Sequence, residues 1–182
     1  MKRLFVPVLL FFCLLLSACG AKAAENQYKS FSQALSARED LSFTARLRAE
    51  YEDRSVEFTL GYTQEADGCT VTVLEPALIA GIQAHLSPEG ASLEFDGISV
   101  DTGALDAYGL TPLSALPVLA ETLKSGHLES VWEEDGLLFL QLIYSDGLYA
   151  VAGFDQESMT PVRAELVSDG VVKVVCEIEN WR

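Results

Sequence analysis

Basic side chains are scarce in this sequence, and histidine is scarcer still. The 182 residues hold 12 lysines and arginines and two histidines against 27 aspartates and glutamates, for a formal charge of −15. An acidic surface repels the phosphates of nucleic acids and the anionic headgroups of lipids. The composition therefore argues against nucleic acid as a partner. Solubility outside the cell explains the acidity more simply than recognition of a basic partner does.

The motifs of common catalytic and metal sites are also missing. The sequence contains no GxSxG elbow, HExxH helix, glycine-rich phosphate loop, EF-hand loop or CxxC pair. His85 and His127 lie on the wet side of an expected strand and at an expected helix end, with no serine or cysteine in a recognisable catalytic arrangement. We therefore predict a protein that is not an enzyme, with no catalytic residues, no cofactor and no metal ion.

One apolar run, residues 4–16, contains no charge and follows two basic residues, as in a signal peptide. It is shorter than the roughly 20 residues that a membrane-spanning helix needs. It ends in Leu16-Ser17-Ala18-Cys19, which resembles the lipobox of bacterial lipoproteins. The resemblance implies that residues 1–18 are removed and that Cys19 carries acyl chains such as palmitate, anchoring the protein to the outer face of the cell membrane. An unlipidated signal peptide and an uncleaved anchor are the alternatives.

The predicted mature chain is long enough for one domain with a real core. Cleavage leaves 164 of the 182 residues and ten basic residues against 27 acidic ones, so the formal charge becomes −17. We expect residues 19–26 to form the lipidated N-terminus and a spacer, and residues 27–182 to form a single domain. The two remaining cysteines, Cys69 and Cys176, either form a disulfide, which needs Cα atoms within about 7 Å, or stay buried as free thiols.

Alternation of apolar and polar residues predicts a predominantly β domain. The first strand is the clearest, because Leu41, Phe43, Ala45 and Leu47 alternate with polar residues. Five Asp-Gly pairs separate apolar stretches and favour tight hairpin turns. The pattern predicts about eleven antiparallel strands at residues 41–51, 55–63, 69–74, 82–86, 91–95, 98–100, 128–133, 137–144, 148–154, 161–167 and 171–181.

Helical periodicity appears in two places. Apolar residues recur at helical spacing in residues 28–37, and again at Val118, Leu119 and Leu123 within the segment 105–126. Gly126 is expected to end this second helix. Residues 76–82 are expected to form a single helical turn.

The strand at residues 137–144 is apolar on both faces. Leu138, Leu140 and Leu142 lie on one face and Leu137, Phe139 and Ile143 on the other. A strand of that kind is covered on both sides, so we expect helices to pack on this sheet. The large residues expected on the inner face line either a packed core or a hydrophobic cavity, and the sequence leaves both open. They are Phe43, Leu47, Phe58, Leu60, Val71, Leu93, Phe95 and Phe139.

The order of a helix followed by a long meander resembles the LolA/LolB-like lipoprotein-carrier superfamily. The resemblance is also carried by residues 74–82 (LEPALIAGI), 109–113 (GLTPL) and 154–165 (FDQESMTPVRAE). It implies an incomplete antiparallel β-barrel of about eleven strands, with short helices over a concave face that receives lipid chains. The membrane-bound acceptor of this superfamily inserts an exposed leucine loop into membranes, for which Leu78-Ile79 is the nearest candidate here.

The sequence is most similar in character to LolA-like lipoproteins of clostridia, one group of which supports a cell-wall amidase during spore germination. Two functional hypotheses follow from the resemblance. The first is a membrane-anchored extracytoplasmic lipoprotein that binds a lipid, an acyl chain or a lipoprotein without catalysis. The second is an interaction module that binds and supports a cell-envelope enzyme such as a cell-wall amidase, through an open sheet edge or its outer surface.

Overall fold

The structure is a computed structural model that describes residues 22–103 and 110–182. The expected signal peptide, Cys19 and residues 105–109 of the expected helical segment lie outside the described residues. Within the described part of the chain, no helix is long and apolar enough to cross a membrane.

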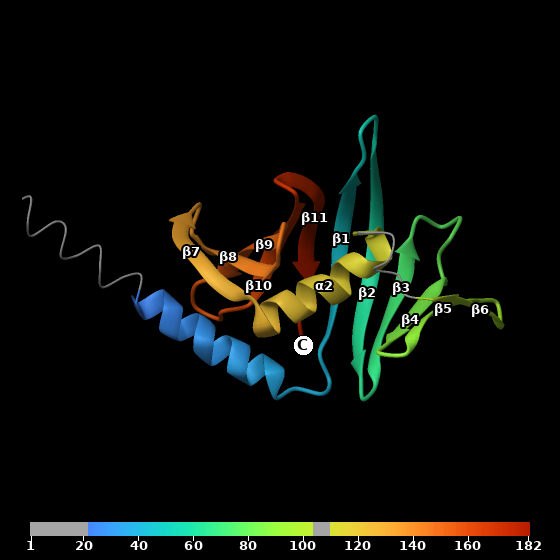
Figure 1. The fold of residues 1–182 in the computed structure, drawn as a ribbon, viewed down its shortest axis with the longest axis horizontal. Coiled ribbons are helices and arrows are strands. Elements are labelled where there is room, and N and C mark those ends of the chain that lie inside the picture. The colour runs from blue at the N-terminus through green and yellow to red at the C-terminus, as the bar shows by residue number, and fades with distance from the viewer. Residues whose placement is uncertain (1–21, 104–109) are drawn as a thin grey trace, which may run out of the picture.

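A single antiparallel sheet of eleven strands dominates the fold (Figure 1), in the order β6-β5-β4-β3-β2-β1-β11-β10-β9-β8-β7. Each predicted strand is present, and the bounds differ from the prediction by a few residues. The sheet is open, because β6 and β7 form its two ends. The strands are β1 (Ser42–Glu50), β2 (Ser55–Glu65), β3 (Gly68–Glu75), β4 (Gln83–Ser87), β5 (Gly90–Phe95), β6 (Ile98–Gly103), β7 (His127–Glu134), β8 (Leu137–Ser145), β9 (Leu148–Asp155), β10 (Pro161–Ser168) and β11 (Val171–Glu179).

The Asp-Gly pairs form hairpin turns, as predicted. At Asp135-Gly136, which joins β7 to β8, both residues have positive φ angles of 50° and 79°. Aspartate tolerates this left-handed region better than most residues, and glycine enters it without a steric penalty. Such a turn twists in the same sense as the strands that it connects.

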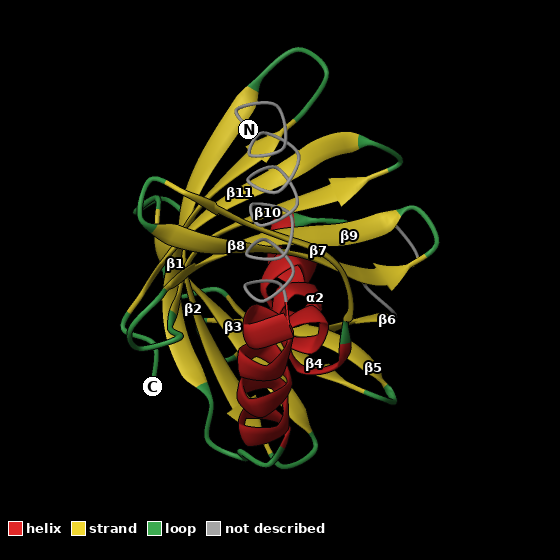
Figure 2. Ribbon diagram, turned by 90° about the vertical axis from the view of Figure 1, so that its left-hand side faces the viewer, coloured by secondary structure: helices red, strands yellow, loops and turns green. Residues whose placement is uncertain are grey.

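Two helices lie on the same side of the curved sheet (Figure 2). The N-terminal helix covers residues 22–36, so residues 22–26, which we expected to belong to a spacer, are helical. The second helix, α2 (Pro112–Ser125), begins at the N-cap Thr111 and ends at Gly126, as the sequence predicted for its end. The side chain of Thr111 accepts a hydrogen bond from the backbone N–H of Ser114, which satisfies one of the free N–H groups of the first turn. Residues 76–82 form hydrogen-bonded turns.

The core lies between α2 and the concave face of the sheet. Leu116, Leu119 and Leu123 of α2 are completely buried, and the helix packs on β1, β2 and β3 as well as on β8, β9 and β10. The N-terminal helix adds Ala24, Tyr28 and Leu35 to the same core. The architecture is therefore the incomplete antiparallel barrel with helices over its concave face that the sequence resemblance implied.

The two apolar faces of β8 have different surroundings. Leu138, Leu140 and Leu142 are buried in the core and face α2, whereas Leu137 and Ile143 are only half-buried on the convex side. Helices therefore pack on this sheet as expected, but they cover one face of β8, and the other face is covered only in part. A period of two identifies two apolar faces, but it does not say which face a helix covers.

Cys69 and Cys176 are free and buried thiols. Cys69 lies on β3 and Cys176 on β11, which are three strands apart in the sheet order. The register also offsets them along the sheet, because Cys176 pairs with Leu47 whereas Cys69 lies level with Leu41. Six residues along a strand span about 20 Å, well beyond the roughly 7 Å between Cα atoms that a disulfide tolerates. Of the two expectations for these cysteines, the free thiols are the one that the structure supports.

Candidate functional site: a filled concave face, an open wing and a helix–strand groove

Most of the residues expected to line a cavity belong to the packed core. Phe43, Leu47, Leu60 and Val71 are each at most 3% exposed, and Phe58 packs against the same core. Phe43 also stacks on Tyr62, with ring centroids 4.9 Å apart. The centre of the concave face is therefore filled by protein side chains.

The concave face is open at the end of the sheet formed by β5 and β6. Phe95 is paired with Ile98 and Leu93 with Val100, so all four side chains share the concave side of this hairpin. Leu93 is half-buried, whereas Phe95, Ile98 and Val100 are 50%, 68% and 57% exposed. We call these four residues the open wing. Of the eight residues expected to line a cavity, Leu93 and Phe95 belong to the open wing.

Phe139 is on the opposite, convex face, which corrects its assignment to the inner surface. It stacks on Trp132 with ring centroids 5.5 Å apart, and its ring lies over Gly153, where an added Cβ atom would come within 2.8 Å. Phe139 pairs with these two residues across β7, β8 and β9. The assignment was wrong because both faces of β8 are apolar. The face that packs in the core is the one with Leu138, Leu140 and Leu142, not the one with Phe139.

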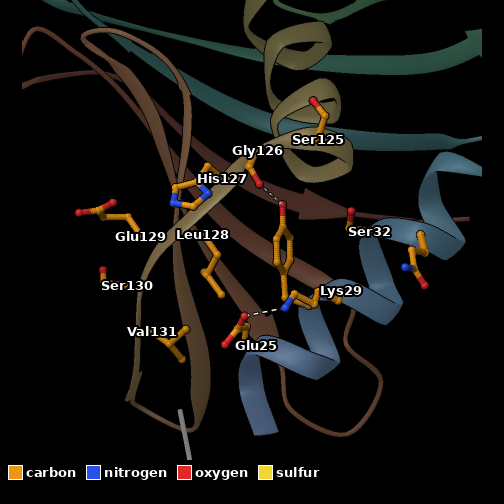
Figure 3. Close-up of a pocket in the computed structure, with 12 residues that line it drawn as sticks. Glu25, Lys29, Ser32, Ser125, Gly126, His127, Leu128, Glu129, Ser130 and Val131 are labelled. Atoms are coloured by element: carbon orange, nitrogen blue, oxygen red, sulfur yellow. Dashed lines mark hydrogen bonds and ion pairs between the residues drawn. The ribbon is translucent and has the colours of Figure 1, made fainter. Parts of the chain in front are cut away.

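A groove of about 730 Å³ lies between the N-terminal helix and β7 (Figure 3). We call it the helix–strand groove. The hydroxyl of Tyr28 donates a hydrogen bond of 2.8 Å to the carbonyl of Gly126, and Lys29 Nζ lies 2.6 Å from Glu25 Oε1. Burial raises the pKa of Tyr28 to about 12, so the hydroxyl keeps its proton, and this hydrogen bond, well into the alkaline range. The groove is lined by Glu25, Tyr28, Lys29, Ser32, Gln33, Ser125, Gly126, His127, Leu128, Glu129, Ser130 and Val131.

Sequence reasoning did not find this groove. Its walls come from segments about 100 residues apart, and the contacts that hold them together are not local: Tyr28 bonds Gly126, and the hydroxyl of Ser32 donates to the carbonyl of Lys124 at 2.6 Å. The polar residues of the N-terminal helix could have suggested one wall of a groove. The spacing of residues in the sequence could not show that β7 forms the other wall.

The two histidines lie on different parts of the sheet. His127 begins β7 and lines the helix–strand groove. His85 on β4 has Nδ1 2.9 Å from Thr70 Oγ1 and Nε2 3.5 Å from Glu94 Oε2, across three neighbouring strands. Within residues 22–103 and 110–182, no group of three or more histidine, cysteine or acidic side chains is placed to hold a metal ion.

Leu78 is 91% exposed in the segment between β3 and β4. Its neighbour Ile79 instead packs partly against the core. An exposed leucine is therefore present at the position where the sequence offered its nearest candidate for such a loop.

These features define the class of the protein. It is a half-open antiparallel β-barrel with helices packed on its concave face. Solved structures similar to the chain include a LolA superfamily protein from Nitrosomonas europaea, with 11% identity, a TM-score of 0.44, and coverage of 80% of this chain and 86% of that one. They also include a DUF1329 family protein from Desulfovibrio piger, with 10% identity, a TM-score of 0.49 and coverage of 89% and 92%.

A third similar structure is that of the CwlD amidase from Clostridioides difficile in complex with the GerS lipoprotein, with 15% identity, a TM-score of 0.43 and coverage of 87% and 94%. No family model matches the sequence, and no curated protein matches it either. At these identities no residue role is carried from a neighbour to this chain.

Proposed function

We propose that this protein is a non-enzymatic binding protein of the bacterial cell envelope, anchored through Cys19, that holds an apolar ligand such as a lipid acyl chain on the open wing. The observation that carries the proposal is the row of exposed apolar side chains at Phe95, Ile98 and Val100, which continues the apolar concave face beyond the reach of the packed core. Large apolar side chains that share one exposed surface are typical of a binding site.

The size of this surface limits what it can bind. Complete burial of a side chain such as Phe, Ile or Val stabilises by about 1.5–3 kcal/mol, and roughly half of each of the three is still exposed, so together they supply on the order of 4 kcal/mol. By themselves these three side chains therefore support a dissociation constant no tighter than about 1 mM, because association also costs translational and rotational freedom. Tighter binding needs further contacts. The half-buried Leu93 is one candidate, and the half-buried Ile82 is another, because it directly precedes β4, the strand that pairs with β5.

An acyl chain fits this requirement better than a polar ligand. Each methylene that leaves water contributes about 0.8 kcal/mol, so a chain lying along the concave side of β5 and β6 gains affinity with its length. Only one face of the hairpin is apolar, so an acyl chain would bind on that face. The convex face is polar and is formed by Ser92, Glu94, Ser99 and Asp101.

The first experiment is native mass spectrometry of residues 19–182 with Cys19→Ala, purified without detergent, followed by solvent extraction. A co-purifying lipid near one per protein is the expected result, and a fluorescent fatty acid then serves as the probe for titration. Val100→Glu should weaken its binding at least tenfold, because it places a charge on the open wing. Ser99→Glu is the matched control, since it adds the same charge to the same strand on the other face. Equal binding by both variants would overturn the site.

A protein-interaction role is the second candidate, and the filling of the concave face by Leu116, Leu119 and Leu123 favours it. A module of this kind would support a cell-envelope enzyme, such as a cell-wall amidase, through its outer surfaces. A clean apo mass in the first experiment, together with no uptake of the fatty acid, would make this the leading function.

A further inference from the structure

The last strand of the sheet, β7, has a free edge. Among residues 22–103 and 110–182, β7 pairs with β8 alone, and it stands at the end of the sheet order. Because the two-residue turn Asp135-Gly136 joins these strands, Glu134 and Leu137 form the hydrogen-bonded pair that closes the hairpin.

Bonded and non-bonded pairs then alternate along the hairpin, so the N–H and C=O groups of Val131 and Glu133 point away from β8. Val131 and Glu133 both lie between the turn and the register shift at residue 129, so the alternation is not interrupted at either of them. These backbone groups can pair with another strand.

This edge borders the helix–strand groove. The groove runs along residues 127–131 of β7, which at about 3.4 Å per residue is roughly 17 Å, and the N-terminal helix forms its other wall. The bond from Tyr28 to Gly126 ties the two walls together. A cleft of about 730 Å³ beside an unpaired strand edge has the length for an extended segment of about five residues.

The strand side of the groove carries charge of one sign, whereas the helix side carries Lys29, which is paired with Glu25. Between Lys124 and Arg163 the sequence contains no lysine or arginine. Over the same stretch it contains seven carboxylates, of which Glu129, Glu133 and Glu134 are exposed on β7 itself. The carboxylates are Glu129, Glu133, Glu134, Asp135, Asp146, Asp155 and Glu157.

We propose that β7 accepts an extended, lysine- or arginine-rich segment of a partner protein as an added strand along the helix–strand groove. Backbone hydrogen bonds to the free edge supply the pairing, and the carboxylates supply the preference for a basic segment. A second copy of β7 is disfavoured as occupant, because its own carboxylates would face these across the pair. The surface is separate from the open wing and does not depend on an apolar ligand there.

The test uses a fluorescein-labelled ten-residue peptide of alternating lysine and threonine, with a glutamate-for-lysine peptide as its control. Fluorescence anisotropy with residues 19–182 carrying Cys19→Ala should show saturable binding of the lysine peptide that weakens as salt is raised. N-methylation of alternate peptide residues, which removes the donors of one edge, should abolish it. Equal binding of the glutamate peptide, or no loss on N-methylation, would overturn the proposal.

Variants of the protein locate the site. Val131→Pro removes an outward N–H group and should bind the lysine peptide at least tenfold more weakly than Val131→Ala, which shortens the same side chain but keeps the donor. If Val131→Pro does not fold, the N-methylated peptide still tests the pairing. The pair Glu129→Gln and Glu133→Gln should weaken binding severalfold and flatten its salt dependence, whereas Glu57→Gln with Glu89→Gln should not.

Two further outcomes would overturn the inference. If the wild-type domain is a dimer by light scattering and Val131→Pro makes it a monomer, the edge serves self-association instead. If Val100→Glu on the open wing abolishes peptide binding while Val131→Pro leaves it unchanged, the peptide binds the apolar site. If the domain without changes on the open wing binds the lysine peptide but takes up no fatty acid, the proposed function alone is refuted.

Discussion

Truncation of Leu119 to alanine tests whether α2 is a fixed part of the core or a lid that lifts from it. The side chain is completely buried in the middle of α2, which packs on strands from both halves of the sheet. Leucine-to-alanine changes at such sites remove favourable burial and leave a cavity, and they typically cost 2–5 kcal/mol. For Leu119→Ala we expect a loss of about 3 kcal/mol in the free energy of unfolding.

The effect is measured by urea and thermal unfolding of residues 19–182 with Cys19→Ala. For a domain of this size each kcal/mol lowers Tm by about 2–4 °C, so the expected shift is about 6–12 °C. Leu78→Ala is the matched control, because the same atoms are removed from a side chain that is 91% exposed, and it should change stability by less than about 0.5 kcal/mol.

A loss below about 1 kcal/mol for Leu119→Ala would refute the reasoning. It would mean that α2 contributes little to the folded state in solution, and that the centre of the concave face is accessible to a ligand. The open wing would then be only one end of a larger site.

Three further predictions follow from burial and from the N-terminal motif. Ala45 is completely buried, so Ala45→Trp should lower the free energy of unfolding by about 1–3 kcal/mol, measured by thermal unfolding. If this variant lost fatty-acid uptake but kept its stability, Ala45 would not belong to the packed core. Burial raises the pKa of Cys69 to about 11 and that of Cys176 to about 12, so both thiols should resist iodoacetamide at pH 8 until the protein unfolds. Because the thiols ionise near pH 9 in the unfolded chain but not in the folded protein, the free energy of unfolding should fall as the pH rises from 9 toward 12. Cys176→Ala should reduce that fall. A disulfide in the intact mass would contradict the assignment of free thiols. Finally, Cys19→Ala should move the full-length protein from the membrane fraction to the soluble fraction, and retention in the membrane would argue against the lipid anchor.

The strands and turns could be predicted because their signals are local. The alternation from Phe43 to Leu47 and the Asp-Gly pairs each act over a few residues, and the structure places a strand or a turn at each of them. The end of α2 at Gly126 was predicted for the same reason. These features depend on neighbouring residues in the sequence and not on which distant segments pack against them.

The site could be predicted only in part, because it depends on which surfaces the helices cover. Leu47 and Phe95 both read as inward residues, yet one is buried in the packed core and the other is half exposed. Phe139 shows the same limit on β8, where two apolar faces compete for one core. The helix–strand groove needs the pairing of Tyr28 with Gly126, 98 residues away, which no spacing rule supplies.

The early start of the N-terminal helix has a consequence for how the protein would sit in the envelope. The chain is already helical at residue 22, only three residues after Cys19. Three residues reach at most about 11 Å even when fully extended. If Cys19 is acylated, the domain would not drift on a tether but would lie close against the bilayer with few orientations open to it. Encounters with ligands and partners would then take place in the plane of the membrane, where orientation and local density, rather than bulk concentration, decide how often they succeed.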